Sequence, residues 1–134
     1  MHRLLYISTA RTILSPEELR QILLVSRRNN GAAGVTGLLV VGGKRFLQAL
    51  EGPEEAVRAT FARIERDPRH FAIVKLADQP TDTLSFQRWS MGFEEGGSGG
   101  SSTNLTDQIA NIVAPIADAS LRAYFTGFAR SHSS

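Results

Sequence analysis

Four polar side chains stand out because of the chemistry that their surroundings would allow. Tyr6 lies in the apolar run LLYIS, and Gln48 lies in the apolar run FLQALEG. Asn29 and Asn30 follow two arginines and stand directly before Gly31. A side-chain amide both donates and accepts hydrogen bonds, and a phenol has a proton to give. Since an unsatisfied buried amide costs about 1–3 kcal/mol, Gln48 needs a partner if its strand is buried.

Each of these residues also has a purely structural interpretation. A strand tyrosine is usually a core residue whose hydroxyl finds a partner at the rim. Gln48 would be harmless on the outward face of a strand, and Asn29-Asn30-Gly31 could serve only to end a helix. Without further context, the residues leave both interpretations open.

Other kinds of chemistry find no support in the sequence. There is no cysteine, and the three histidines lie far apart, so neither a thiolate site nor a zinc site is expected. A glycine-framed nucleophilic serine and the glycine-rich loops that bind phosphates or dinucleotides are also missing. We therefore expect no metal.

Composition limits the class of protein and its partners. The chain has 134 residues, of which 42% are hydrophobic and 21% charged, as expected for one folded domain. Its net charge of +2 is too small to indicate a nucleic-acid or membrane surface. No apolar run approaches the ~20 residues that a membrane span needs. The expectation is a cytoplasmic protein.

The elements that must position the four residues follow from hydrophobic patterns and breakers. Ser15, Pro16 and Glu18 form a capping box with proline at the first helical position. The predicted strands are 2–8, 35–41, 44–52, 71–76 and 86–93, and the predicted helices run from 15 to about Arg28 and from 52 to about 67. This order is the ferredoxin-like βαββαββ pattern of an α+β protein, with both helices on one face of the sheet. The first and third strands are then central neighbours, so Tyr6 and Gln48 can meet beneath the helices.

A low-complexity stretch, Glu94–Thr103 (EEGGSGGSST), separates this unit from the rest of the chain. We divide the sequence into a domain over 1–95, a flexible linker over 96–103 and a helical extension over 104–134. Pro115 splits the extension into two helices, the second from about Ile116 to Ala129. We predict that this second helix covers the bare sheet face or joins subunits in a homo-oligomer. The prediction rests on its apolar residues Leu121, Tyr124, Phe125 and Phe128.

Six motifs, in order and each on its expected element, resemble the BLUF domains, the sensors of blue light using FAD. They extend over roughly Leu4 to Phe93: LLYIS, SRRNN, GVTGLLVV, FLQALEG, DPRH and WSMGF. The resemblance implies a non-enzymatic photoreceptor that holds FAD without a covalent bond, with FMN or riboflavin as possible substitutes. The absence of cysteine excludes photochemistry that bonds a cysteine to the flavin.

The resemblance also implies roles for individual residues. Tyr6 would donate an electron and a proton after excitation, and Gln48 would rotate or tautomerise as the switch. Cofactor contacts are implied for Asn29, Asn30, Gln48, Arg69 and His70. Trp89 and Met91, which share one face of a strand, would relay the change to the sheet, the C-terminal helices and a downstream signalling protein.

Two other functions remain to be separated from this one. Small ferredoxin-like enzymes cleave acyl phosphates with an arginine and an asparagine, for which Arg11 and Asn30 are the candidates. A non-photoactive regulatory module that dimerises through its sheet is the other. Fold alone does not decide among them, whereas a flavin spectrum that shifts red in blue light supports only the photoreceptor.

Overall fold

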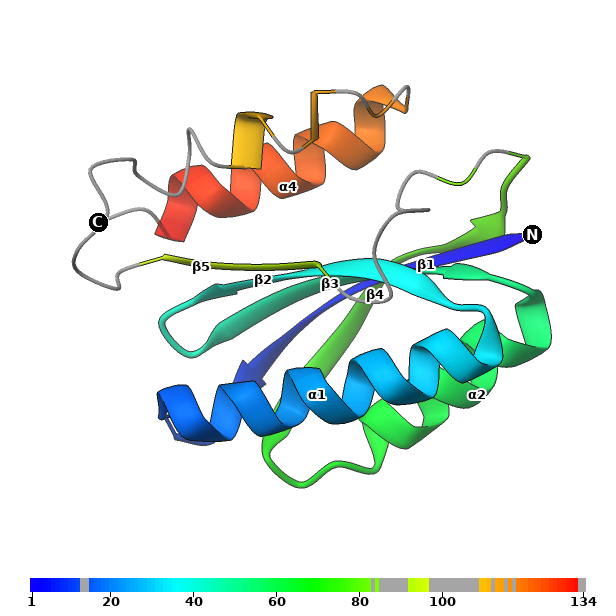
Figure 1. Ribbon diagram of the computed structural model, residues 1–134. Helices are drawn as coiled ribbons and strands as arrows, with labels where there is room; N and C mark the ends of the chain where they lie inside the picture. Colours follow the sequence, from blue (N-terminus) through cyan, green and yellow to red (C-terminus); the bar gives the residue numbers. More distant parts are fainter. Residues whose placement is uncertain are drawn as a thin grey trace.

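The computed structural model shows one β-sheet with helices on both faces (Figure 1). Helices α1 (Pro16–Ala33) and α2 (Glu54–Glu65) lie on one face, and α4 (Ala119–His132) lies on the other. The residues that the structure describes are 1–12, 15–82, 84, 92–96, 109–111, 113–114, 116 and 118–132.

The sheet has five strands in the order β4-β1-β3-β2-β5. Their bounds are β1 His2–Ala10, β2 Thr36–Gly42, β3 Arg45–Gly52, β4 His70–Pro80 and β5 Gly92–Gly96. The first four strands pair in antiparallel fashion, and β5 runs parallel to β2. The ferredoxin-like α+β prediction is confirmed, including the central β1–β3 pair.

Helix α1 begins as its sequence predicts. The side chain of Ser15 accepts a hydrogen bond from the backbone N–H of Glu18, and the Glu18 side chain accepts one from the N–H of Ser15. Pro16 occupies the first turn, where a missing N–H costs nothing.

The end of α1 was predicted wrongly. The helix continues past Arg28 through Ala33, and Gly34 closes it in the left-handed conformation with φ 74°. The backbone N–H of Gly34 donates to the carbonyls of Asn30 and Gly31, which is the usual geometry of a glycine cap. Asn30 and Gly31 therefore lie inside the helix, because packing of its last turn outweighs the weak helix propensity of glycine.

The remaining boundaries differ from the predictions by smaller amounts. Pro53 is the residue that precedes α2, not its first helical residue. Strand β4 is longer than the predicted 71–76 at both ends. Strand β5 includes Glu94, Glu95 and Gly96, so the start of the low-complexity stretch is paired with β2 and is not a linker. The predicted strand segment 86–91 lies outside the described residues.

Two hydrophobic clusters pack on opposite faces of the sheet. The cluster under α1 and α2 includes Leu4, Tyr6, Leu39, Leu50 and Phe61. The cluster under α4 joins sheet residues to residues from the C-terminal part of the chain: Leu5, Leu38, Val40, Leu47, Ala49, Ile109, Val113, Ile116, Leu121, Phe125, Phe128 and Ala129.

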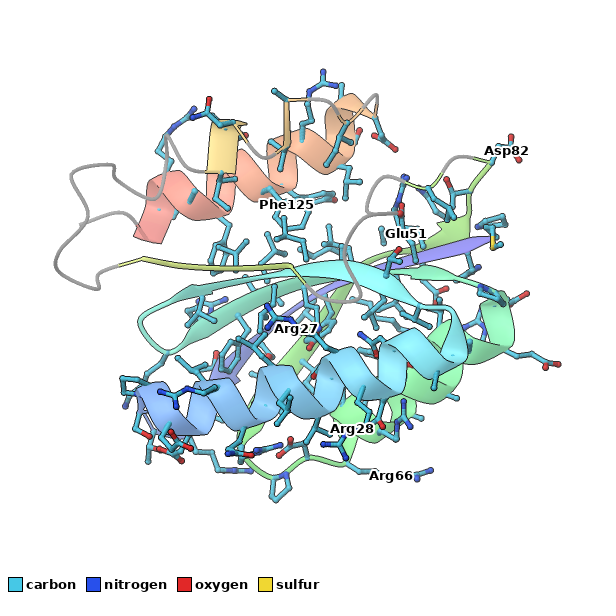
Figure 2. All side chains as sticks on the ribbon, viewed as in Figure 1. Arg27, Arg28, Glu51, Arg66, Asp82 and Phe125 are labelled. Carbon is cyan, nitrogen blue, oxygen red and sulfur yellow. The ribbon has the colours of Figure 1, made fainter. Side chains whose placement is uncertain are left out.

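The second cluster explains how the far face of the sheet is covered. Figure 2 shows Phe125 between α4 and the sheet, and this side chain is completely buried. Helix α4 begins at Ala119, not at Ile116, since Asp118 precedes it and accepts a hydrogen bond from the N–H of Leu121.

Among the helices within the described ranges, none combines the length and apolar character that a membrane span requires.

Candidate functional site

A cavity of about 350 Å³ lies between α1, α2 and the sheet. Helix α1 contributes the largest share of its walls, and the floor comes from β1, β2 and β3. The lining residues are Tyr6, Leu19, Gln21, Ile22, Val25, Ser26, Asn29, Asn30, Leu39, Phe46, Gln48, Thr60, Arg63, Ile64, Asp67, Arg69 and His70. Its volume is within the ~300–1,000 Å³ that pockets for small ligands and cofactors usually have.

The floor of the cavity holds a buried tyrosine–glutamine pair. Tyr6 and Gln48 stand directly opposite each other in the β1–β3 register, and the two residues are 3% and 6% exposed. The Tyr6 hydroxyl donates a hydrogen bond to Oε1 of Gln48. Tyr6 therefore supplies the hydrogen-bonding partner that the buried Gln48 amide requires.

Burial also affects the acidity of Tyr6. Removal of the phenol from water raises its pKa well above the usual value, and the nearby Asp67 carboxylate raises it further. A raised pKa means that the neutral form is favoured. Tyr6 thus retains its proton at physiological pH and donates it in the hydrogen bond to Gln48.

Asn30 and Asn29 both border the cavity, but in different settings. Asn30 is 2% exposed and points inward from the last turn of α1, whereas Asn29 is half-buried. The backbone carbonyl of Asn30 accepts hydrogen bonds from the N–H groups of Gly34 and Val35. Since these contacts fix the helix end, they also hold the Asn30 side chain at the cavity wall.

His70 lies at the junction of β4, β1 and α2. Its Nε2 is 2.6 Å from the carbonyl oxygen of Ile64, and its Nδ1 is 2.9 Å from Oγ of Ser8. A carbonyl oxygen can only accept, so in the neutral ring Nε2 carries the hydrogen and Nδ1 accepts from Ser8. The ring is therefore fixed in one tautomer and one orientation at the cavity edge.

Arg69 forms an ion pair with Asp67 at the same rim. Its Nε donates to Oδ1 of Asp67 at 2.8 Å, and the terminal nitrogen donates to Oδ2. The hydrogen bond from Arg69 lowers the pKa of the Asp67 carboxyl, which is partly offset by desolvation. Arg63 also lines the cavity, whereas Arg66 is exposed and is not part of the lining.

The structure thus brings Tyr6, Asn29, Asn30, Gln48, Arg69 and His70 around one cavity. Trp89 and Met91 lie outside the described residues. Two neighbours were missed in the sequence: Ser8, which is fully buried against His70, and Asp67 at the rim. Strand alternation was an available signal for Ser8, because it shares the face of Tyr6 two residues away.

The pair proposed for acyl-phosphate cleavage is not assembled. Arg11 donates from Nε to the carbonyl of Pro68 and lies over the ring of Phe71, outside the cavity lining that contains Asn30. Within the part of the chain that the structure describes, no three side chains of histidine, aspartate or glutamate gather as metal ligands would.

The shape and donor set of the cavity fit a flavin ring. Aliphatic side chains of α1, including Leu19, Ile22 and Val25, supply an apolar wall, and the buried amides of Asn30 and Gln48 supply donors and acceptors. A flat heteroaromatic ring with an edge of carbonyl oxygens and nitrogens needs both kinds of contact.

Comparisons with known proteins agree with this fit. The family model described as sensors of blue-light using FAD matches residues 1–92. The blue light- and temperature-regulated antirepressor BluF of Escherichia coli (strain K12) is 38% identical over 73 residues, which cover 54% of this chain and 18% of that protein. The chain therefore spans less than a fifth of the length of this curated relative.

Solved structures show the same fold. BlrB, a BLUF protein in its dark state, has a TM-score of 0.71 at 25% identity, with 97% of this chain and 96% of BlrB covered. Klebsiella pneumoniae BlrP1 with FMN and cyclic diGMP has a TM-score of 0.75 at 26% identity, with 96% of this chain and 35% of BlrP1 covered. With the match over residues 1–92, these findings show that the chain belongs to the BLUF family of flavin-binding blue-light sensors.

Proposed function

We propose that this chain is a non-enzymatic blue-light photoreceptor whose signal begins at Tyr6 and Gln48. The observation that carries the proposal is the buried hydrogen bond between these two side chains at the floor of a cavity that fits a flavin. In this proposal, residues 1–95 hold the cofactor non-covalently, 96–103 include a connecting segment and 104–134 form a helical extension.

The cofactor supplies blue-light absorption and, when excited, a site that accepts an electron. Tyr6 loses an electron together with its hydroxyl proton, because its raised pKa makes loss of the proton alone unfavourable. The phenol proton would pass to Oε1 of Gln48, and Nε2 of the same amide would release one proton to the group that had accepted the electron, so that charge stays balanced. Return of the electron and proton to the phenol leaves Gln48 rotated or tautomerised, with its donor and acceptor positions exchanged.

The other lining residues would orient the ring and its tail. Asn30 is proposed as the main anchor because its amide is buried, and Asn29 as an additional contact. The imidazole of His70, which is held in one orientation, would lie at the edge of the flavin ring. Arg69 would lie beside the cofactor tail. The matched family uses FAD, and the similar BlrP1 structure contains FMN, so the ring is the shared element.

The proposed output leaves through the sheet and the C-terminal helices. Trp89 and Met91 are proposed relay residues, and the recipient is proposed to be a second subunit or a separate signalling protein in the cytoplasm. BluF and BlrP1 contain much sequence beyond the matched region, as expected of a sensor that works together with other domains, whereas BlrB is matched over 96% of its length. No membrane or nucleic-acid partner is proposed.

An absorption spectrum tests this function directly. Full-length protein purified with FAD is expected to be yellow and to shift its flavin absorption to longer wavelength in blue light, with recovery in the dark. A flavin-free protein would instead support the plain regulatory module. Hydrolysis of an acyl phosphate by flavin-free protein would support the enzyme.

Asn30→Ala is expected to weaken FAD binding by about 1–2 kcal/mol, because the ring edge loses one hydrogen-bonding partner. This corresponds to about a 5–30-fold increase in Kd. Fluorescence titration of flavin-free protein with FAD measures the change. Asn29→Ala is the matched control and should have a smaller effect, since Asn29 is only half-buried. Equal affinity of Asn30→Ala and wild type would remove Asn30 as an anchor.

A further inference from the structure

A charged network, buried at Arg3 and Glu51 and 35% exposed at the Asp118 side chain, lies on the face of the sheet opposite the cavity. The Arg3 and Glu51 side chains are 4% and 0% exposed, and Nε of Arg3 donates to Oε2 of Glu51 at 2.7 Å. A terminal nitrogen of Arg3 donates to Oδ2 of Asp118 at 3.0 Å. Asp118 stands directly before α4, so Arg3 connects β1 and β3 to the start of this helix.

The network lies on the same two strands as the photochemical pair. In the β1–β3 register, Arg3 is opposite Glu51 and Tyr6 is opposite Gln48. The two pairs are three residues apart, about 10 Å along each strand. Since side chains alternate between faces, an odd separation places them on opposite faces. Figure 2 shows Glu51 on the α4 side of the sheet.

Cluster membership confirms this arrangement. Tyr6 belongs to the hydrophobic cluster under α1 and α2, whereas Leu5 and Ala49 belong to the cluster under α4. Arg3 alternates with Leu5 along β1, and Glu51 alternates with Ala49 along β3. One pair of strands therefore carries the photochemical pair toward the flavin and the charged pair toward α4.

Asp118 has a separate role for each of its carboxylate oxygens. Oδ1 accepts the backbone N–H of Leu121 at 3.1 Å and so caps the first turn of α4. Oδ2 accepts from Arg3. The Leu121 hydrogen bond is the main cause that lowers the pKa of the Asp118 carboxyl, with Arg3 also contributing. The helix start and the sheet thus depend on the same ionised group.

Buried ion pairs rarely stabilise a protein more than well-packed apolar residues would, because desolvation offsets their attraction. Their directional hydrogen bonds do fix geometry, which apolar contacts fix less tightly. A shift of β1 against β3 would move Arg3 relative to Glu51, and the hydrogen bond to Asp118 would then be strained or released.

We propose that the Arg3–Glu51–Asp118 network is the coupling element through which rearrangement of Tyr6 and Gln48 changes the docking of α4. This inference rests on the proposed photoreceptor function. It makes Arg3 and Glu51, on the β1–β3 pair, and Asp118, directly before α4, positioning residues for output in addition to the proposed relay residues Trp89 and Met91. The network and α4 together supply the two-state element that transmission of a local change requires.

Hydrogen–deuterium exchange of the FAD-loaded full chain, in the dark and under blue light, tests the proposal. Wild type is expected to exchange faster within 119–132 in the light. Asp118→Asn keeps an oxygen to cap Leu121 but turns an amide toward Arg3, which breaks the charged link. This variant should retain the flavin red shift and lose the light-dependent difference in α4.

Two further variants separate coupling from simple loosening of the helix. Leu121→Ala removes a buried contact of α4 but no member of the network, so its exchange should be faster overall and still depend on light. Arg3→Lys retains the charge and should restore part of the difference that Arg3→Gln loses.

The outcomes have distinct meanings. A light-dependent difference that persists in Asp118→Asn, or that vanishes equally in Leu121→Ala, overturns the role of the network. The same conclusion follows if wild type shows the red shift without any change in α4. Absence of the red shift in wild type instead overturns the underlying photoreceptor function.

Discussion

Gln48→Leu is expected to bind FAD and to lose the light-induced red shift completely. Leucine is apolar and similar in volume, so the β3 strand should still fold and the cavity should keep its walls. The Tyr6 hydroxyl, however, loses the acceptor that it uses in the structure. Without an amide whose donor and acceptor can exchange places, no altered hydrogen-bond network can persist after illumination.

Tyr6→Phe is expected to give the same spectral result for a complementary reason. Phenylalanine keeps the aromatic ring, whose centroid lies 5.4 Å from that of Phe61, but it has no hydroxyl proton to give. Difference spectra recorded before and after blue light, at matched flavin content, measure both variants. If only one of the two variants lost the red shift, Tyr6 and Gln48 would not act as a pair.

Gln21→Leu is the matched control for Gln48→Leu. Gln21 also lines the cavity, but it is exposed on the surface of α1. Its Nε2 donates a hydrogen bond to Oε1 of Glu17 at 3.2 Å. The same glutamine-to-leucine change at this site should leave the red shift intact. If Gln48→Leu shifts as wild type does, the proposed proton route is wrong.

Phe125→Ala should have the largest effect on stability of the single changes considered. Phe125 is completely buried between α4 and the sheet, and removal of such a ring costs about 3–5 kcal/mol through lost burial and the remaining cavity. Urea denaturation is the measurement, with the midpoint lowered and the slope unchanged if unfolding stays two-state. The proposed flavin cavity lies on the other face, so folded Phe125→Ala protein should still bind FAD.

Tyr124→Ala tests whether burial is the cause. This neighbouring aromatic residue on α4 is 41% exposed, so its removal should change stability by much less than removal of Phe125. If the two variants lost similar amounts of stability, α4 would not pack on the sheet through the face that carries Phe125.

Strong local signals determined much of the fold in advance. The capping box at Ser15 and Glu18 specifies where α1 begins, because each group that it satisfies is within one helical turn. The predicted topology made the first and third strands central neighbours, so that Tyr6 and Gln48 could meet. This placement was possible because the ferredoxin-like order leaves few arrangements of the first and third strands.

The same local reasoning failed where long-range packing decides. The sequence predicts that α1 ends near Arg28, before Asn30-Gly31, since both residues are poor helix formers. In the folded chain, the buried Asn30 side chain and the cap at Gly34 hold the helix together through Ala33. Contacts with the rest of the molecule outweigh a propensity difference of about 1 kcal/mol.

The sequence by itself determined the family motifs, the order of the elements and the neighbouring positions of the strands that carry Tyr6 and Gln48. Only the tertiary structure decided that Ser8 orients His70, that α4 covers the far face and that Arg3 joins Glu51 to Asp118. Arg3 and Asp118 are 115 residues apart in the chain. No periodicity or cap signal reports such a contact, because it exists only when the sheet and the C-terminal helix pack together.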